Sequence, residues 1–277
     1  MKKELNLKTS EEILQAYFDS VAEHSKGDED LIKTQLLPLD MIIRGMKKGE
    51  LMLVFGEPFT GKTAFILQLL NNFVVKSKKS VLLFSPENSA YDIAERMIIA
   101  DSGIRRRELY TGDLEESEWL DLNIAGSRFS EANIKISDAS YLPLDRLTAT
   151  VEKAVKDNKT DIVLIDSIDN IGYNESNSQK VRTLKNIACA YNVLVICSCG
   201  IPHTQDEANK NAYIRKTGEH ADVIIRIQRE LFGTYDESRE AHLMIFKNNK
   251  GGVSSVVITF DLDRYVFREQ NEQFNER

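Results

Sequence analysis

The chain has 277 residues, of which 36 are Lys or Arg and 43 are Asp or Glu, so its formal net charge is −7 at pH 7. This length suits one large domain or two small ones, and 42% hydrophobic with 29% charged residues excludes wholesale disorder. No apolar run is long enough to span a bilayer, and the residues after Met1 lack the apolar stretch of a secretion signal. We therefore expect a cytoplasmic protein without a membrane partner. Three cysteines are too few for a disulfide framework, and the acidic balance disfavours a simple electrostatic nucleic-acid binder.

The first predicted element is an amphipathic helix over residues 10–24, SEEILQAYFDSVAEH. Its apolar side chains recur at spacings of one, three and four residues, and Ser10 followed by two glutamates is typical of a helix start. The polar, glycine-containing segment SKGDEDLIK follows and indicates a linker. Residues 1–30 are therefore predicted to form a helical arm and linker separate from the main body.

From residue 51 onward, short apolar segments alternate with longer helical ones. This alternation predicts crossover units and a mostly parallel sheet covered on both faces. The predicted strands are 51–55, 80–85, 133–137, 161–166 and 192–198, and the predicted helices are 63–76, a segment ending near 102, 144–156 and 178–191. In the last third, strands at 222–230, 241–249 and 254–262 with short polar turns indicate hairpins at one edge. The predicted fold class is α/β.

A phosphate-binding pattern, G-x-x-x-x-G-K-[ST], lies between the first predicted strand and the helix that follows it. Its residues are Gly56, Glu57, Pro58, Phe59, Thr60, Gly61, Lys62 and Thr63. In this context the backbone N–H groups of the loop and helix start bind phosphate oxygens. We expect Lys62 to contact the β- and γ-phosphates of ATP and the Thr63 hydroxyl to bind Mg²⁺. An ordinary glycine turn is the alternative, and the full motif with both flanks favours the phosphate site.

Two carboxylates follow other predicted strands. Asp166 ends the strand at 161–166, and the carboxyl edge of a parallel sheet is where ligands bind, so Asp166 could hold a water on Mg²⁺. A helix N-cap is the alternative. Glu87 follows the strand at 80–85, where a carboxylate could orient and deprotonate an attacking water. From the residues alone, a charge at a helix start is the better interpretation of Glu87.

Three blocks of sequence together resemble one family. FGEPFTGKTAFILQLLNN, FSPENSAYDIAERMIIADSGI and DIVLIDSIDNI are similar to the RecA-like motor domain of DnaB-type replicative helicases. The SPEN block, its helix with Arg96 and the spacing to Asp166 are more specific than the phosphate loop. The resemblance covers about residues 31–265, which implies a RecA-like P-loop ATPase domain followed by a polar tail at 266–277. Only the helical arm stands in the place of the family's primase-binding amino-terminal domain.

The resemblance implies an ATP-driven, ring-forming helicase that acts on single-stranded DNA in replication, with other replication proteins as partners. It implies that Glu87 is the catalytic base. It also implies a head-to-tail homo-oligomer, expected to be a hexameric ring, in which the helix at 10–24 docks on the adjacent subunit. The alternative is that the apolar stripe of this helix folds back on its own domain.

Two positions depart from the family pattern. Cys199 stands where the family has a glutamine that senses the γ-phosphate. Asn249 stands where the family has an arginine that reaches the neighbouring subunit's ATP, whereas Lys247 is kept and Lys250 could replace part of the missing charge. An ammonium lacks the bidentate fork of a guanidinium, so both departures predict slow hydrolysis with nucleotide binding unaffected.

Residues 201–220 are predicted to form a long polar loop that resembles, with a short deletion, the family loop that contacts single-stranded DNA. Its candidate contact residues are Lys210, Arg215, Lys216 and Gly218. A basic loop with a glycine can follow a phosphate backbone, and the copies in a ring would multiply a weak contact. Because the loop also contains Asp206 and Glu207, a solvated surface loop is the alternative.

Two other classes of function stay open. A nucleotide-binding assembly or loader protein would use ATP as a switch without translocation, which the missing glutamine and arginine favour. A recombinase or clock-type ATPase of the wider RecA superfamily is the second, and a recombinase would form DNA filaments and not closed rings. The retained Lys62, Asp166 and Glu87 favour the motor.

Overall fold

The computed structural model describes residues 7–24, 31–204, 206–229 and 240–269. The chain divides into two compact units, residues 1–32 and 33–277. In the first unit, α1 (Ser10–His24) confirms the predicted amphipathic helix. Its cap is Thr9 and not Ser10, because the Thr9 hydroxyl accepts from Glu12 N at 3.2 Å while Glu12 Oε2 accepts from Thr9 N at 2.7 Å. The predicted linker at 25–30 lies outside the described residues.

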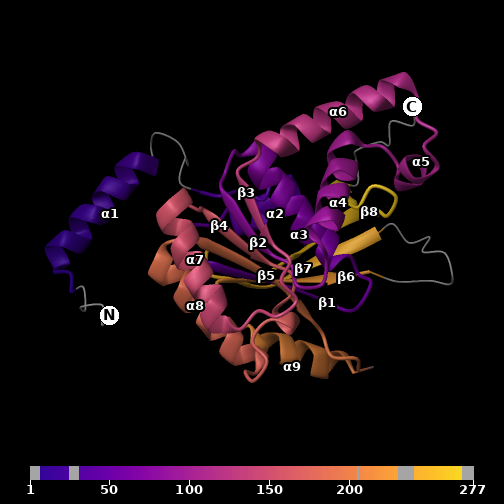
Figure 1. The fold of residues 1–277 in the computed structure, drawn as a ribbon. Helices are drawn as coiled ribbons and strands as arrows, with labels where there is room; N and C mark the ends of the chain where they lie inside the picture. The colour runs from indigo at the N-terminus through magenta and orange to yellow at the C-terminus, as the bar shows by residue number, and fades with distance from the viewer. Residues whose placement is uncertain (1–6, 25–30, 205, 230–239, 270–277) are drawn as a thin grey trace. The chain divides into compact units, whose positions relative to one another are not determined.

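Within the described residues, the second unit contains a nine-stranded sheet of order β3-β2-β4-β5-β1-β6-β7-β8-β9 (Figure 1). The strands from β3 to β6 in this order are parallel, and β7, β8 and β9 are added antiparallel. Their bounds are β1 (Leu51–Gly56), β2 (Val81–Phe84), β3 (Ile134–Ser137), β4 (Ile162–Ile165), β5 (Leu194–Gly200), β6 (Val223–Gln228), β7 (Glu240–Asn248), β8 (Ser255–Asp261) and β9 (Val266–Glu269). The predicted α/β class and the C-terminal hairpins are confirmed.

Helices cover both faces of the parallel strands, with α7 and α8 on one face and α3 and α4 on the other (Figure 1). Their bounds, with the remaining helices, are α2 (Leu37–Ile43), α3 (Lys62–Asn71), α4 (Ala90–Ser102), α5 (Arg106–Thr111), α6 (Glu116–Glu131), α7 (Leu144–Asn158), α8 (Asn177–Tyr191) and α9 (Glu207–Thr217). A π-helical turn, Asn72–Lys76, continues α3. This double cover explains why β1, β2 and β4 are buried at every position and read as continuous apolar runs.

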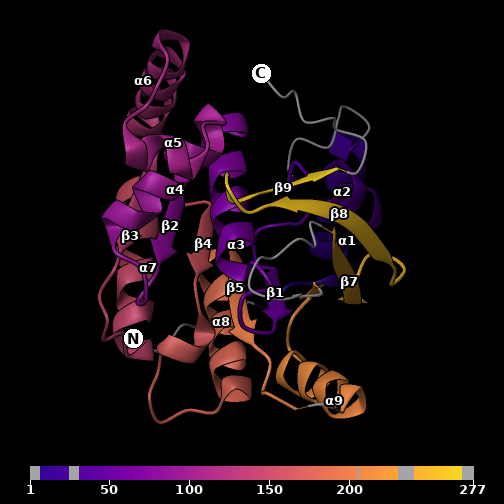
Figure 2. The same cartoon turned by 90° about the vertical axis from the view of Figure 1, so that its right-hand side faces the viewer.

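Residues 201–220 do not form the predicted loop, because Glu207–Thr217 is the helix α9 (Figure 2). The Asp206 carboxylate caps this helix by accepting from Ala208 N at 2.8 Å. Its buried positions are Lys210, Ile214 and Thr217, a helical spacing in which only the middle residue is apolar. The hydrophobic period that would predict a helix is therefore missing from the sequence.

The tail predicted at 266–277 includes the residues of a strand, because Val266–Glu269 forms β9 against β8. Phe267 is 2% exposed, and its ring lies 5.6 Å from that of Phe65 and 4.5 Å from that of Phe260. The backbone of Phe267 exchanges two hydrogen bonds of 2.7 Å with the Gln68 side chain of α3. Residues 270–277 of the predicted tail lie outside the described residues.

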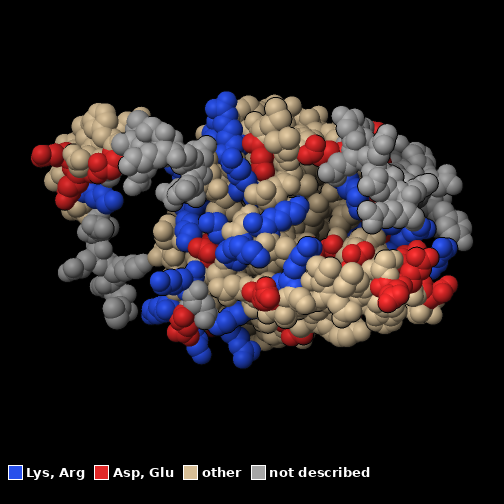
Figure 3. Space-filling model, turned by 90° about the horizontal axis from the view of Figure 1, so that it is seen from above, with Lys and Arg blue, Asp and Glu red and all other residues tan. Residues whose placement is uncertain are grey.

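The surface of the chain is unevenly charged despite its acidic balance. Lys and Arg side chains gather across the middle of the face that Figure 3 shows. Such local segregation of charge raises the potential that a charged partner meets. In the described part of the chain, no helix has both the length and the apolar character that crossing a membrane requires.

We expect Phe267→Ala to lower the free energy of unfolding by about 3–5 kcal/mol, because a buried aromatic ring beneath α3 is removed and a cavity is left. Urea denaturation monitored by circular dichroism measures this change. Val253→Ala is the matched control, since Val253 is 64% exposed and its truncation should cost less than about 0.5 kcal/mol. Equal effects of the two substitutions would show that β9 does not belong to the core.

Candidate nucleotide site and the α9 surface

The predicted phosphate loop connects the end of β1 to the first turn of α3. Gly61, directly before Lys62, has φ +97°, a left-handed conformation that glycine adopts at little cost. A Cβ at Gly61 would lie 2.9 Å from the Phe267 ring, and one at Gly56 would lie 2.5 Å from Thr60 Oγ1. Both glycines are required for the loop to turn this tightly and to present the first N–H groups of α3 at the edge of the sheet.

The backbone carbonyl of Glu57 accepts hydrogen bonds from two side chains of the loop. Thr60 Oγ1 donates to it at 2.8 Å and Lys62 Nζ donates to it at 2.9 Å. Burial lowers the pKa of Lys62, and the carboxylates of Asp166 and Asp169 oppose that change. The Lys62 ammonium is therefore held at the loop by one carbonyl, a contact that a phosphate can replace.

Asp166 directly follows β4 and is 4% exposed. Ser198 Oγ donates to its Oδ1 at 2.6 Å, whereas Oδ2 has no hydrogen-bond partner among the residues that the structure describes. Burial raises the pKa of Asp166, and the hydroxyls of Ser198 and Thr63 lower it. A buried, unpartnered carboxylate oxygen beside the Thr63 hydroxyl fits Mg²⁺, which takes one or two carboxylates together with substrate phosphates and waters.

The described residues contain no cluster of three or more His, Cys, Asp and Glu side chains that could hold a metal ion by themselves. Mg²⁺ usually keeps several waters and is bound by one or two carboxylates and substrate phosphates, so Asp166 and Thr63 would hold it together with such ligands.

Glu87 leaves the sheet at the same edge as Asp166. It follows β2, which pairs with β4 so that Phe84 stands opposite Ile165. Asn170, in the 3₁₀ turn Ile168–Asn170 behind β4, donates to Glu87 Oε1 and, at 3.3 Å, to Ser167 Oγ. The exposed Glu87 carboxylate is thus oriented by a neighbouring amide.

A cavity of about 710 Å³ joins these groups. Lys62, Thr63, Glu87 and Asp166 all line it. Residues outside the predicted site also line it: Arg96, Asp169, Gly200, Arg229, Phe260, Leu262 and Tyr265.

Two of these additional residues are held in place by clear contacts. The guanidinium of Arg96 lies 5.2 Å from the centre of the Tyr265 ring, and Arg229 Nη2 donates to the carbonyl of Phe59 at 2.8 Å. No local pattern marks Arg229 or Tyr265, because each reaches the cavity from a strand end far away in the sequence. For Arg96 the sequence does offer a signal, because this residue lies in the helix that follows SPEN in the family block.

Cys199 lies near the end of β5, opposite Phe55 of β1, and is fully buried. Its Sγ is 4.0 Å from the Tyr213 hydroxyl of α9 and 3.9 Å from Asn177 Nδ2. Burial raises the pKa of this thiol far above its ordinary value, so the thiol stays neutral and offers no charge to a phosphate. The position that the resemblance assigns to a phosphate sensor contacts α9 instead.

The structure separates the residues predicted to contact nucleic acid. Arg215 and Lys216 are exposed in the last turn of α9. Lys210 is 8% exposed, and its ammonium pairs with Glu57 and Glu207. Gly218 is buried, and a Cβ there would lie 2.5 Å from Ile224 Cδ1. Lys210 and Gly218 are thus almost fully buried, whereas Arg215 and Lys216 have exposed side chains, and contact of these residues with nucleic acid stays a prediction.

The residues predicted to face a neighbour's ATP lie at the opposite end of β1 from the phosphate loop. They are held within the chain by bonds from Lys247 Nζ to the Glu219 carbonyl at 2.9 Å, from Asn249 Nδ2 to Asp222 Oδ1 at 3.0 Å and from Lys250 Nζ to Glu50 Oε2 at 2.8 Å. Glu50 directly precedes β1, whereas the phosphate loop follows it. Their contact with a neighbouring subunit stays a prediction, and Lys250 would have to leave Glu50 to make it.

A parallel sheet that ends in a glycine-rich phosphate loop, with acids after two further strands, defines a P-loop NTPase of the RecA-like type. Residues 32–269 match the DnaB-like helicase C-terminal domain, and the chain therefore belongs to that family. The resemblance read from the sequence is confirmed.

The chain is 28% identical to the replicative DNA helicase DnaC of Bacillus subtilis (strain 168), over 96% of this chain and 63% of that protein. It is 26% identical to the replicative DNA helicase DnaB of Geobacillus stearothermophilus, over 97% of this chain and 63% of that protein. The chain thus spans less than two thirds of the length of either relative.

Two solved structures share the fold. A separately solved ATPase domain matches with a TM-score of 0.81 and 22% identity, covering 93% of this chain and 98% of that chain. A DnaB-like replicative helicase, solved in a study of its interactions with primase, matches with a TM-score of 0.76 and 21% identity, covering 97% of this chain and 68% of that chain. These matches confirm the RecA-like ATPase fold.

Proposed function

We propose that this chain is the motor of a replicative DNA helicase, which binds ATP with Mg²⁺, hydrolyses it and moves on single-stranded DNA. The observation that carries the proposal is the cavity that Lys62, Thr63, Asp166 and Glu87 line together. Membership of the DnaB-like family and the replicative helicases among its relatives support the same function. The recombinase alternative receives no support from them.

In this proposal each residue has a distinct task. Lys62 exchanges the Glu57 carbonyl for β- and γ-phosphate oxygens, and the first N–H groups of α3 bind the same phosphates. Asp166 and Thr63 would hold Mg²⁺, which when bound neutralises phosphate charge. Glu87, oriented by Asn170, accepts the proton of the attacking water.

A second candidate function is an ATP-binding assembly or loader protein that hydrolyses slowly and does not translocate. The Cys199 thiol, which lacks the side-chain amide of the family's glutamine, and the ion pair of Lys250 with Glu50 favour it, because in this conformation the thiol lies against α9 and the ammonium is bound to Glu50. The two functions differ in whether single-stranded DNA stimulates hydrolysis, so ATPase rates with and without DNA separate them.

Lys62→Ala is expected to weaken Mg²⁺-dependent ATP binding roughly ten- to hundredfold, because a charge-assisted hydrogen bond worth about 1.5–3 kcal/mol is lost. Isothermal titration calorimetry with and without Mg²⁺ measures it. Lys156→Ala, at an exposed ammonium on α7, is the control. Equal ATP affinity of Lys62→Ala and the wild type would refute the phosphate site.

Glu87→Gln should reduce the turnover rate by about 10²-fold or more while ATP binding survives, because the amide keeps the shape and loses the base. A coupled ATPase assay at saturating ATP gives the rate, and Glu131→Gln on α6 is a charge-matched control. Turnover at the wild-type rate would identify Glu87 as only a charge at a helix start.

Arg215→Ala combined with Lys216→Ala should weaken binding to single-stranded DNA and lower the slope of log K against log salt by about 1.4, or about 0.7 for each phosphate contact. Fluorescence anisotropy over a series of salt concentrations measures the slope. Lys153→Ala with Lys156→Ala removes two exposed charges from α7 and serves as the control. A slope that the α9 substitutions leave unchanged would exclude this surface as the DNA contact.

We further infer a head-to-tail homo-oligomer, expected to be a hexameric ring, assembled through α1 on the adjacent subunit, with other replication proteins as partners. The observation behind it is the apolar stripe of α1, whose side chains at Ile13, Leu14, Tyr17 and Phe18 are more than half exposed. Burying an apolar stripe of this kind against a partner surface is favourable, because its side chains leave water.

Deleting residues 1–28 is expected to yield monomers that still bind nucleotide, because the deletion removes α1 and leaves the cavity intact. Multi-angle light scattering with ATP and DNA reports the mass. Tyr17→Ser with Phe18→Ser tests the stripe without shortening the chain. Rings formed by the shortened protein would show that α1 is not the assembly element.

A further inference from the structure

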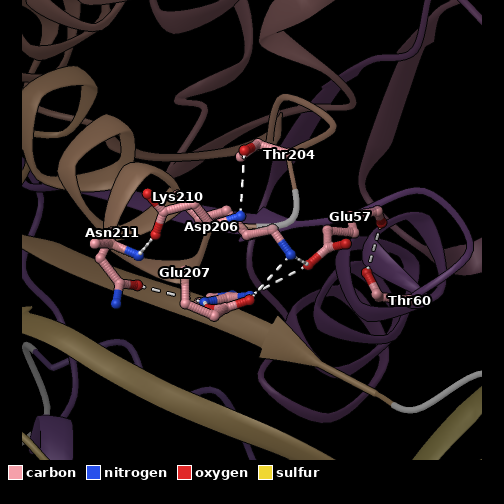
Figure 4. A network of polar contacts seen from close by, with 9 residues as sticks. Glu57, Thr60, Thr204, Asp206, Glu207, Lys210 and Asn211 are labelled. Carbon is pink, nitrogen blue, oxygen red and sulfur yellow. Dashed lines mark hydrogen bonds and ion pairs between the residues drawn. The ribbon is translucent and has the colours of Figure 1, made fainter.

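Four charged side chains from three elements form one network behind the phosphate loop: Glu57, Glu207 and Lys210 of α9, and Arg226 of β6. We refer to them as the Glu57 network. Lys210 Nζ lies 2.9 Å from Glu57 Oε1 and 3.0 Å from Glu207 Oε1. Figure 4 shows the Glu57 side chain turned toward Lys210 and Glu207 of α9.

The Glu57 network contains two carboxylates and two cations, so its formal charges cancel. Arg226, which is 2% exposed, donates to Glu57 at 3.2 Å and to Glu207 at 2.7 Å. Hydrogen bonds from Arg226 and Lys210 lower the pKa of Glu207 to about 2, so this acid stays ionised. Removing either acid would leave two cations, one of them deeply buried, with a single carboxylate, an arrangement that a protein interior tolerates poorly.

Glu57 contacts two different parts of the molecule, one through its side chain and the other through its backbone carbonyl. Its side chain binds α9, while its backbone carbonyl accepts from Thr60 and Lys62. A phosphate at the loop would take the Lys62 ammonium and leave the carbonyl with fewer donors. The residue whose backbone responds to nucleotide is therefore the residue whose side chain holds α9.

A second chain of contacts joins α9 to Asp169, which lines the cavity. Asn177 Nδ2 donates to the Tyr213 hydroxyl of α9 at 3.0 Å and to Asp169 Oδ1 at 2.9 Å. Asp169 lines the cavity, and its Oδ2 accepts from Gly200 N at 2.7 Å. The phosphate loop, through Glu57, and the cavity residue Asp169 are thus each joined to α9 by hydrogen bonds.

We propose that Glu57 is a positioning residue that couples nucleotide binding at the phosphate loop to the placement of α9, and so to the exposed Arg215 and Lys216. This inference rests on the proposed function, since it requires a nucleotide at the loop. Coupling of this kind is reciprocal, so a strand bound at α9 alters nucleotide affinity by the same factor by which nucleotide alters affinity for the strand. It gives the chain a route from nucleotide to DNA that does not pass through Cys199.

The first test is hydrogen–deuterium exchange of the α9 amides, residues 207–217, with and without Mg²⁺ and a non-hydrolysable ATP analogue at saturation. In the wild type we expect the analogue to change their exchange rate about fivefold or more, the lower end of usual coupling factors. In Glu57→Gln and in Lys210→Met this change should fall to within about twofold of no effect. Glu116→Gln, an exposed acid on α6, should behave as the wild type.

A purely structural contact predicts a different result. Loss of the Glu57 network would then speed exchange of α9 equally in both states, and the difference made by the analogue would persist in the variants. That outcome overturns the proposal. Lys210→Met is included because it leaves the sequence of the phosphate loop unaltered, so a failure of Glu57→Gln to fold does not end the test.

The second test is a double-mutant cycle on the ratio of single-stranded DNA affinities with and without the analogue. If Glu57 and Lys210 act as one link, the double variant loses no more coupling than either single variant. Additive losses would show that the two residues act separately, and would overturn the proposal.

The outcomes also separate this inference from the proposed function. If calorimetry finds no nucleotide binding in the wild type, both fail. If nucleotide binds and α9 exchange does not respond, only the coupling fails. If α9 responds while single-stranded DNA does not bind, the coupling stands and the assignment of Arg215 and Lys216 as DNA contacts fails.

Discussion

The parallel pairing of β2, β4, β5 and β1 determines where the residues of the candidate site lie. In this register Phe84 stands opposite Ile165, Ile165 opposite Cys197 and Phe55 opposite Cys199, so the four strands end at one edge. The groups that follow them therefore converge: Glu87 after β2, Asp166 after β4 and the phosphate loop after β1. A shift of one strand by a single residue would turn its core side chains to the other face and break the site at the same time.

The carboxylates near this cavity differ in their neighbours, and these neighbours determine how each carboxylate is oriented. Asp166 is buried with one oxygen bound to Ser198 and the other left without a partner in the described structure, whereas Glu87 is exposed and oriented by Asn170. Glu57, despite its place in the phosphate loop, turns away toward α9. Three acids near one cavity thus have three different environments, in keeping with the different roles proposed for them.

The parts of the fold that could be predicted from the sequence are those with a local pattern. The strands ending at Gly56 and Ile165 are continuous apolar runs, and the phosphate loop carries its own motif between a strand and a helix. By contrast, α9 has one apolar residue, Ile214, among its three buried positions, so its burial depends on charges. Lys210 resembles a surface cation in the sequence because its partner Glu57 lies 153 residues away. Arg229 and Tyr265 reach the cavity in the same non-local way.

The contact between β9 and α3 also bears on how the chain folds during synthesis. Phe267 lies against Gly61 of the phosphate loop, and its backbone bonds to Gln68, 199 residues earlier in the chain. A ribosome releases Gln68 long before Phe267, so the nascent chain holds α3 and its loop without the ring that packs beneath them. Contacts between such distant residues form late, because the long intervening chain must first be ordered. The packing of the phosphate loop is therefore complete only once the last described strand has been made, and any ligand that binds the completed loop alone would stabilise the whole domain in preference to its fragments.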